Sequence, residues 1–110
     1  MSDAATKTTT SIDAILTTAA RAHAARLCKQ AMAPIPGIIP TPTQRARAER
    51  YQVEEFTMHK AQNERIVADL LLHPAEGEPL VDTREAFLAA VDTYRAAGLA
   101  EVRRLFAAAR

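Results

Sequence analysis

The sequence predicts an all-α fold, and three observations lead to that class. Apolar residues recur at spacings of three and four over long stretches, which is the periodicity of a helix that buries one face. Alanine, the strongest helix former, is frequent, whereas glycine occurs only three times. The strict alternation of a half-buried strand is not found. We therefore expect three long helices, over about residues 11–33, 43–73 and 82–108, in an elongated bundle.

The first predicted helix begins at Ser11, because serine favours the N-cap position. It ends at Ala33, because Pro34 disfavours helical geometry in the residue before it. One stripe at helical spacing forms its apolar face: Ile12, Leu16, Ala19, Ala20, His23 and Leu27. Residues 1–10 are polar, and we expect them to form a tail before a single helical domain over residues 11–110.

The segment between the first two predicted helices reads APIPGIIPTPT and contains four of the six prolines. Proline fixes φ and lacks a backbone donor, so we expect an extended strap in polyproline II geometry. A solvated linker is normally rich in glycine, serine or charged residues and not in large apolar side chains. We therefore expect Ile35, Ile38 and Ile39 to be buried, either against their own bundle or against another chain, and we take them as candidate partner-binding residues.

The second predicted helix carries apolar residues on two sides. Its stronger stripe ends in two apolar turns and contains Val53, Phe56, Asn63, Ile66, Val67, Leu70 and Leu71. Tyr51 and Met58 belong to a weaker stripe on nearly the opposite side. A helix with two apolar sides usually has neighbours on both. Tyr51 and Met58 are therefore further candidate partner-binding residues.

The third predicted helix opens at the sequence DTRE, where either Asp82 or Thr83 can cap its N-terminus. A clean apolar stripe runs from there to the C-terminus: Leu88, Val91, Val102, Leu105 and Phe106. Gly98 lies on the same face, although glycine in a helix interior costs up to ~1 kcal/mol relative to alanine. We expect another helix to approach closely at this position.

The sequence contains no constellation that predicts a catalytic residue, a cofactor or a metal ligand. The three separated glycines cannot form a phosphate-binding loop or a dinucleotide fingerprint. Cys28 is the only cysteine and has no base on its helix face, so we expect a buried, inert thiol. Glu55 and His59 share a face, but the paired Glu-x-x-His pattern of metal-binding bundles is missing.

Charge is unevenly distributed, although the formal net charge is only +1. Bases predominate in residues 1–50 and 95–110, whereas acids predominate in residues 51–94. The opposite-signed segments can neutralise each other within one fold, or a basic face of one copy can meet an acidic face of the next. Clustered bases are also typical of nucleic-acid contacts, and the candidates are at the start of the second predicted helix: Arg45, Arg47 and Arg50.

Large side chains are scarce for a domain of this length, which favours further burial against another chain. We expect a non-enzymatic helical assembly or interaction protein that acts as a subunit of a larger complex, for example a structural component of a virus-like or other multi-copy particle. Its partners would be proteins, in a homo-oligomer or a multi-subunit assembly. The alternative is a small nucleic-acid-binding regulator that uses the arginines of the second helix.

Two features bear on location. The N-terminus lacks the apolar core of a secretory signal, and the longest apolar run, IVADLLL, is too short to cross a bilayer. A single cysteine is compatible with a reducing compartment. We therefore expect no membrane partner and a cytoplasmic location, or a place within an assembly formed in the cytoplasm.

Overall fold

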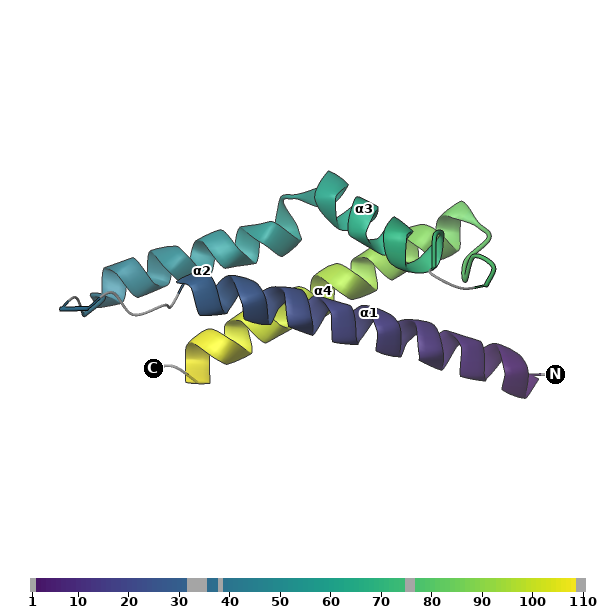
Figure 1. Ribbon diagram of the computed structural model, residues 1–110, viewed down its shortest axis with the longest axis horizontal. Coiled ribbons are helices and arrows are strands. Elements are labelled where there is room, and N and C mark those ends of the chain that lie inside the picture. The colour runs from purple at the N-terminus through teal and green to yellow at the C-terminus, as the bar shows by residue number, and fades with distance from the viewer. Residues whose placement is uncertain (1, 32–35, 38, 75–76, 109–110) are drawn as a thin grey trace.

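The four helices of the structure lie along one long axis (Figure 1). The structure is a computed structural model that describes residues 2–31, 36–37, 39–74 and 77–108, with only the backbone described for residues 2–10. The helices are, in chain order, α1 (Ser2–Ala31), α2 (Pro42–Thr57), α3 (Lys60–Leu71) and α4 (Arg84–Ala108). The molecule measures 58 × 26 × 22 Å, so the predicted all-α, elongated bundle is confirmed.

Helices α1 and α4 run in the same direction and cross, and α2 followed by α3 runs back above them (Figure 1). The contact between α1 and α4 is the most extensive in the fold. The apolar stripes predicted from the sequence meet there, because Leu16 and Ala20 of α1 are buried together with Val91 and Val102 of α4.

Phe56 of α2 and Val67 and Leu71 of α3 complete the core from above. The predicted close approach at Gly98 is confirmed, because the ring of Phe56 packs directly on this glycine. Cys28 is buried as predicted, and the pKa of its thiol is raised by burial and further by Glu101 and Glu49. Such a thiol stays protonated and is a poor nucleophile.

Two of the predicted boundaries are wrong. Helix α1 begins at Ser2 rather than at Ser11, because no glycine or proline in this segment interrupts the helix. The second predicted helix, over residues 43–73, is two helices, because α2 ends at Thr57 and α3 begins at Lys60. The fold therefore has four helices where we expected three.

The other helix ends follow the local sequence. Thr41 caps α2 in a capping box: its hydroxyl accepts a hydrogen bond from the Gln44 amide (3.1 Å), and its own amide donates to the Gln44 side chain (2.9 Å). Pro42 then occupies the first turn, where its missing N–H is harmless. At α4, the hydroxyl of Thr83 accepts a hydrogen bond from the amide of Ala86 (3.1 Å). Of the two predicted caps, Thr83 makes this bond.

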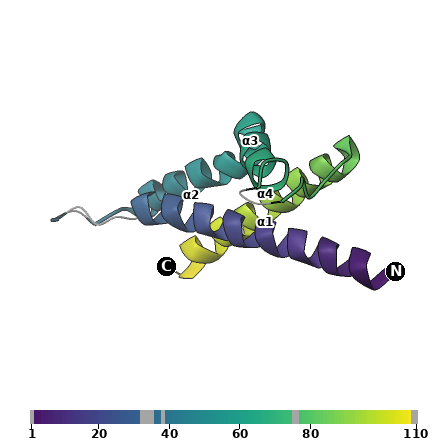
Figure 2. The same cartoon turned by 45° about the vertical axis from the view of Figure 1, so that its right-hand side comes forward.

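Of the residues between α1 and α2, the structure describes 36–37 and 39–41, and these lie beyond the helices at one end of the molecule, as two views show (Figures 1 and 2). They include a turn at Pro36 and Gly37, where φ is +81°, a value that glycine adopts without strain. Ile39 is 87% exposed. Burial of Ile39 against its own bundle is therefore wrong, because Ile39 precedes the first residue of α2 and lies outside the packed faces of the described helices. Ile35 and Ile38 lie outside the described residues.

Candidate functional site

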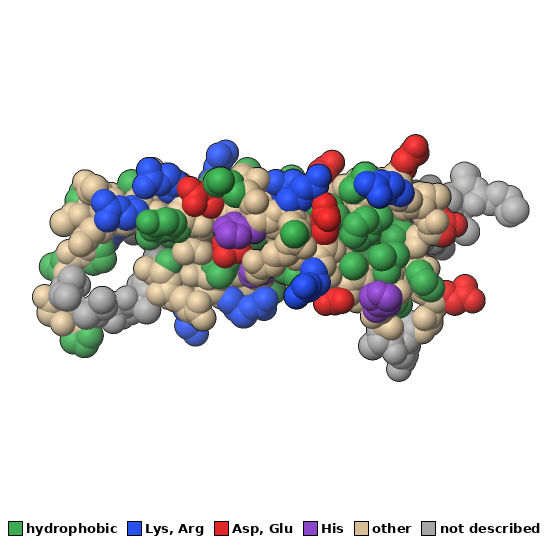
Figure 3. Space-filling model, turned by 90° about the horizontal axis from the view of Figure 1, so that it is seen from above, with side chains coloured by type: hydrophobic (Ala, Val, Ile, Leu, Met, Phe, Trp, Pro, Cys, Tyr) green, Lys and Arg blue, Asp and Glu red, His purple; other side chains and the backbone are tan. Residues whose placement is uncertain are grey.

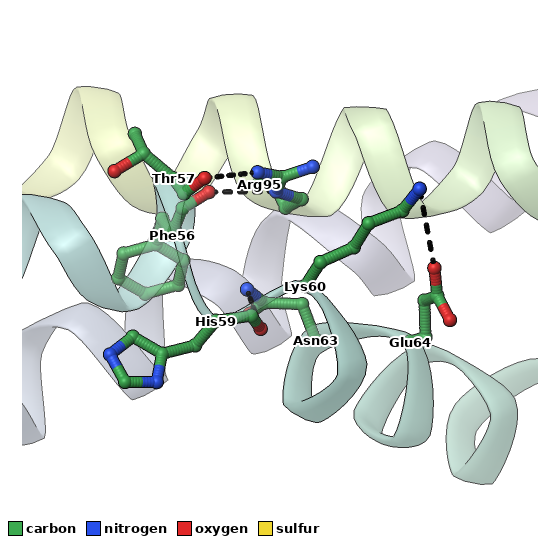
Figure 4. Close-up of polar contacts among 7 residues, drawn as sticks. All are labelled: Phe56, Thr57, His59, Lys60, Asn63, Glu64 and Arg95. Carbon is green, nitrogen blue, oxygen red and sulfur yellow. Dashed lines mark hydrogen bonds and ion pairs between the residues drawn. The ribbon is translucent and has the colours of Figure 1, made fainter.

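The break between α2 and α3 lies on the upper surface of the molecule (Figures 1 and 4). Met58 and His59 separate the two helices, and the break contains neither proline nor glycine. The end of a helix leaves backbone carbonyls without partners inside the helix. Side chains from two other elements supply the missing donors here.

Arg95 of α4 holds the end of α2 (Figure 4). Its Nε donates a hydrogen bond to the carbonyl of Phe56 (2.8 Å), and its Nη2 donates to the carbonyl of Thr57 (2.6 Å). The planar guanidinium presents these two donors in a fixed fork, so it fixes two consecutive carbonyls at once. The direction in which α2 ends is therefore set by a residue of α4.

Asn63 of α3 holds the break from the other side. Its Nδ2 donates to the carbonyl of Glu55 (2.9 Å) and to the carbonyl of His59 (2.8 Å), and the side chain is fully buried. A buried amide with both donors used fixes the backbone around it. The imidazole of His59 is exposed and points away from Asn63 (Figure 4), so the backbone of His59, and not its ring, belongs to this network.

The outer face of α2, which we define as Arg47, Tyr51, Glu54 and Met58, presents two large apolar side chains to solvent. Tyr51 is 57% exposed and Met58 is 71% exposed. They are seven residues apart, which is about two helical turns, so they lie on one side of α2, opposite the buried Phe56. The space-filling view from above shows hydrophobic side chains interspersed with charged ones (Figure 3). The structure thus brings two of the predicted partner-binding residues together.

Ile39 does not belong to this face. It precedes α2, whereas Met58 follows it, so the two residues lie at opposite ends of the helix. The arginines of the alternative prediction are all exposed but spread around the helix. Successive residues of a helix are about 100° apart, so Arg45 and Arg47 project to nearly opposite sides. The structure does not gather Arg45, Arg47 and Arg50 into one row.

A buried polar pair joins α1 to α4 beneath α2. The Nδ1 of His23 lies 2.7 Å from the hydroxyl of Tyr94, and both residues are buried. The ring of Phe56 meets the imidazole edge-on, with 5.1 Å between the ring centres. The sequence analysis placed His23 on the apolar face of its helix but did not identify this pair, because its partner is 71 residues away.

Burial determines the charge of this pair. Burial lowers the pKa of His23 and Arg26 lowers it further, while Glu55 acts in the opposite direction. Burial also raises the pKa of Tyr94 to about 12. Both rings are therefore uncharged at neutral pH, and neither is open to a substrate. We interpret the pair as part of the core.

An open groove of about 690 Å³ lies at the turn between α3 and α4. Its lining is apolar with charged residues at the rim, and consists of Leu72, Glu78, Pro79, Leu80, Val81, Asp82, Thr83, Arg84 and Phe87. The amide of Leu80 donates a hydrogen bond to the carbonyl of Leu71 (2.7 Å), which ties the turn to the end of α3. The sequence analysis did not identify this groove, because its walls come from two helices and their connection.

Across the described residues, no three His, Cys, Asp or Glu side chains are grouped so that they could hold a metal ion. None of the helices in the described part of the chain has the length and apolarity needed to cross a membrane. In comparisons with known proteins, the chain matches no protein-family model, no curated protein and no solved structure.

Proposed function

We propose that this chain is a non-enzymatic helical interaction protein, a subunit of a larger complex, and that the outer face of α2 contacts its partner. The observation that supports this most directly is the exposure of Tyr51 and Met58 on one side of α2. Tyrosine, methionine and arginine are enriched at protein–protein interfaces. Arg47 and Glu54 flank the two apolar side chains and provide the polar surroundings typical of such a contact.

The rigidity of the helix break also favours this function. Met58 lies directly after the carbonyls that Arg95 holds and before the carbonyl of His59 that Asn63 holds. A contact residue whose backbone is fixed before binding loses less conformational entropy when the complex forms. The α2–α3 break thus places an exposed apolar side chain at a fixed point of the surface.

Site-specific photo-cross-linking in the native cell tests this function. We expect a photoreactive phenylalanine analogue at position 51 or 58 to give a discrete protein adduct, and the same analogue at the exposed Asp92 of α4 to give none. Tyr51→Glu should remove the adduct formed from position 58 without changing the helical content. The absence of adducts at both positions, or equal adducts at position 92, would contradict the proposal.

Nucleic-acid binding through Arg45, Arg47 and Arg50 is the second candidate function, and the spread of these residues around α2 does not favour it. We expect no appreciable binding to a generic duplex at physiological salt. If the chain does bind, the affinity should fall steeply with salt and disappear when all three arginines are replaced by glutamine. Salt-sensitive binding that depends on the three arginines would favour nucleic-acid binding over protein interaction as the function of this chain.

A further inference from the structure

One backbone torsion angle accounts for most of the break between α2 and α3. Met58 lies in the right-handed helical region, with φ of −113° and ψ of −26°. His59 has a φ of −89°, which is still within the helical range, but its ψ is +59°. Because ψ in an α-helix is about −42°, a rotation of about 100° about this single bond would make His59 helical. The break and an uninterrupted helix therefore differ mainly at one residue.

Side chains replace the backbone donors that are missing between α2 and α3. In an uninterrupted helix, the amides of residues 59–61 would donate to the carbonyls of residues 55–57. Here the first of those carbonyls accepts a hydrogen bond from Asn63, and the other two accept from Arg95. If the break closed, backbone amides would satisfy the same three carbonyls, so the number of hydrogen bonds at these carbonyls would not change.

The local sequence favours the uninterrupted helix. Neither glycine nor proline occurs in residues 43–73, and their periodicity alone predicts one helix. The bent arrangement also leaves the Oε2 of Glu55 buried, with no hydrogen-bond donor among the described residues. A buried acceptor without a donor lowers the stability of the fold. The bend is therefore maintained by contacts with the rest of the molecule.

Packing on α1 and α4 maintains the bend, and α2 has fewer buried side chains than α3. In α3, Asn63, Val67 and Leu71 are buried, whereas in α2 only Phe56 is buried. If the break closed, α2 and α3 would share one axis, and the bend between them in Figure 1 would disappear. Because α3 is held by more buried side chains, we expect α2 to move and Phe56 to leave its place on Gly98.

We propose that the α2–α3 break is a hinge with a bent and a straight position. In the bent position, Arg95 and Asn63 hold the carbonyls at the break (Figure 4), and Phe56 covers the core. In the straight position, residues 42–71 form one helix and α2 stands away from α4. Four hydrogen bonds order the bent position, so the hinge alternates between two defined arrangements and is not a flexible loop. The inference goes beyond the proposed function, because the motion requires no partner.

The hinge would change the direction of α2 without changing its outer face. Met58 is helical in both positions, so Tyr51 and Met58 stay two turns apart on one side of α2. The straight position would uncover Phe56 and the two rings that it contacts, those of His23 and Tyr94. A protein that binds one position more tightly than the other shifts the hinge toward that position.

Amide hydrogen exchange, measured residue by residue by NMR, tests the hinge. Within residues 39–74, which the structure describes apart from its gaps elsewhere, the amides of residues 59–61 do not donate to the carbonyls of residues 55–57. They would do so in the straight position. Because Arg95→Met removes two bonds that exist only in the bent position, we expect it to raise the protection of these amides by about tenfold or more. A mere loss of stability would lower protection throughout the chain.

Lys60→Pro should lock the hinge in the bent position. Position 60 is the first residue of α3, where proline is favoured because the amide needs no helical acceptor. In the straight position, the same proline could not bond to the carbonyl of Phe56, and its ring would clash with that carbonyl. The matched control is Lys60→Ala, which removes the same exposed side chain and its ion pair with Glu64 but leaves the backbone unrestricted.

The two changes at position 60 are then combined with Arg95→Met. Lys60→Pro should return the protection of the amides at positions 59 and 61 to the wild-type level, and Lys60→Ala should leave it raised. If Arg95→Met does not fold, Arg95→Lys, which keeps the charge but lacks the fork, gives the same comparison.

Two results would overturn the hinge. One is protection at positions 59–61 that stays as low as in the wild type in a folded Arg95 variant. The other is protection at positions 59 and 61 that rises equally with Lys60→Pro and with Lys60→Ala. Neither result affects the adducts expected from positions 51 and 58, so failure of the hinge and failure of the proposed function are distinguishable.

Discussion

The ring of Phe56 in α2 lies on Gly98 of α4, and a Cβ atom added at position 98 would overlap the Cδ1, Cε1 and Cζ atoms of the ring. Helix propensity alone would make Gly98→Ala stabilising by up to about 1 kcal/mol. We expect instead that Gly98→Ala lowers the free energy of unfolding by about 1–3 kcal/mol, because the ring of Phe56 must move within a packed core. Urea unfolding of the purified variant measures this loss.

The double variant shows whether the loss comes from this contact. In a Phe56→Leu background the ring is gone, so Gly98→Ala should no longer destabilise and should recover part of the gain in helix propensity. If Gly98→Ala changes the free energy of unfolding equally in both backgrounds, its cost does not come from a clash with the ring of Phe56.

Arg95→Met should weaken the attachment of α2 to α4. The substitution keeps much of the side-chain length but removes both donors to the carbonyls of Phe56 and Thr57. We expect a loss of about 2 kcal/mol, since hydrogen bonds to charged groups contribute about 1.5–3 kcal/mol. Arg95→Lys should restore only part of it, because an ammonium lacks the fork. Arg103→Met, an exposed change on the same helix, should have little effect on thermal unfolding.

Asn63→Asp should be more harmful than its small change in size suggests. The buried amide donates to the carbonyls of Glu55 and His59, whereas a carboxylate at this position would repel both. We expect a loss of about 3 kcal/mol or more, as for an uncompensated buried charge. The matched control is Gln62→Glu, the same chemical change on the exposed neighbour. Similar losses from the two variants in chemical denaturation would contradict the role given to Asn63.

Stability should fall as the solution is acidified below pH 6.5, and His23 should be one cause. Because burial lowers the pKa of His23 below the ordinary histidine value of 6.5, the unfolded chain binds a proton before the folded chain does as the pH falls. The free energy of unfolding therefore decreases as the pH falls from 6.5 toward the pKa of the folded state, and His23 contributes no slope above that window.

Denaturant unfolding at a series of pH values measures this effect. His23→Gln should flatten the slope, because it removes the imidazole whose pKa is lowered by burial. The Tyr94 hydroxyl, with a pKa of about 12, does not titrate in this range. An unchanged slope in His23→Gln would show that another group is responsible.

The helical class and the apolar stripes could be predicted from the sequence because both follow from local periodicity. The same is true of a cap at Asp82 or Thr83, of the buried Cys28 and of the close approach at Gly98, whereas the choice of Thr83 over Asp82 came from the structure. The break at Met58 and His59 could not be predicted in this way. It contains no helix breaker, and the donors that stabilise it come from Asn63 within α3 and from Arg95, which is 38 residues beyond Thr57.

Other features depend on where the helices lie relative to one another. The sequence suggested that Ile39 would be buried against its own bundle or another chain, but its 87% exposure in this chain depends on how the helices pack and not on the local sequence. The groove between α3 and α4 likewise depends on the turn that joins them. Among the residues proposed for partner contact, the seven-residue spacing of Tyr51 and Met58 already indicates that they share one side of a helix. The positions of Arg45, Arg47 and Arg50 on different sides of α2 also follow from helical geometry, once the bounds of α2 are known.

The first helix of the chain packs most extensively on the last one, and this has a consequence for the order of folding. During synthesis α1 is made before α4, so Leu16 and Ala20 remain without their partner surface until α4 has been made. Contacts between residues that are distant in sequence also lower the folding rate, compared with helical proteins whose contacts are mostly local. The apolar face of α1 therefore has no partner surface until α4 has been made, and a chaperone that binds apolar helices would have its binding site exposed during this interval.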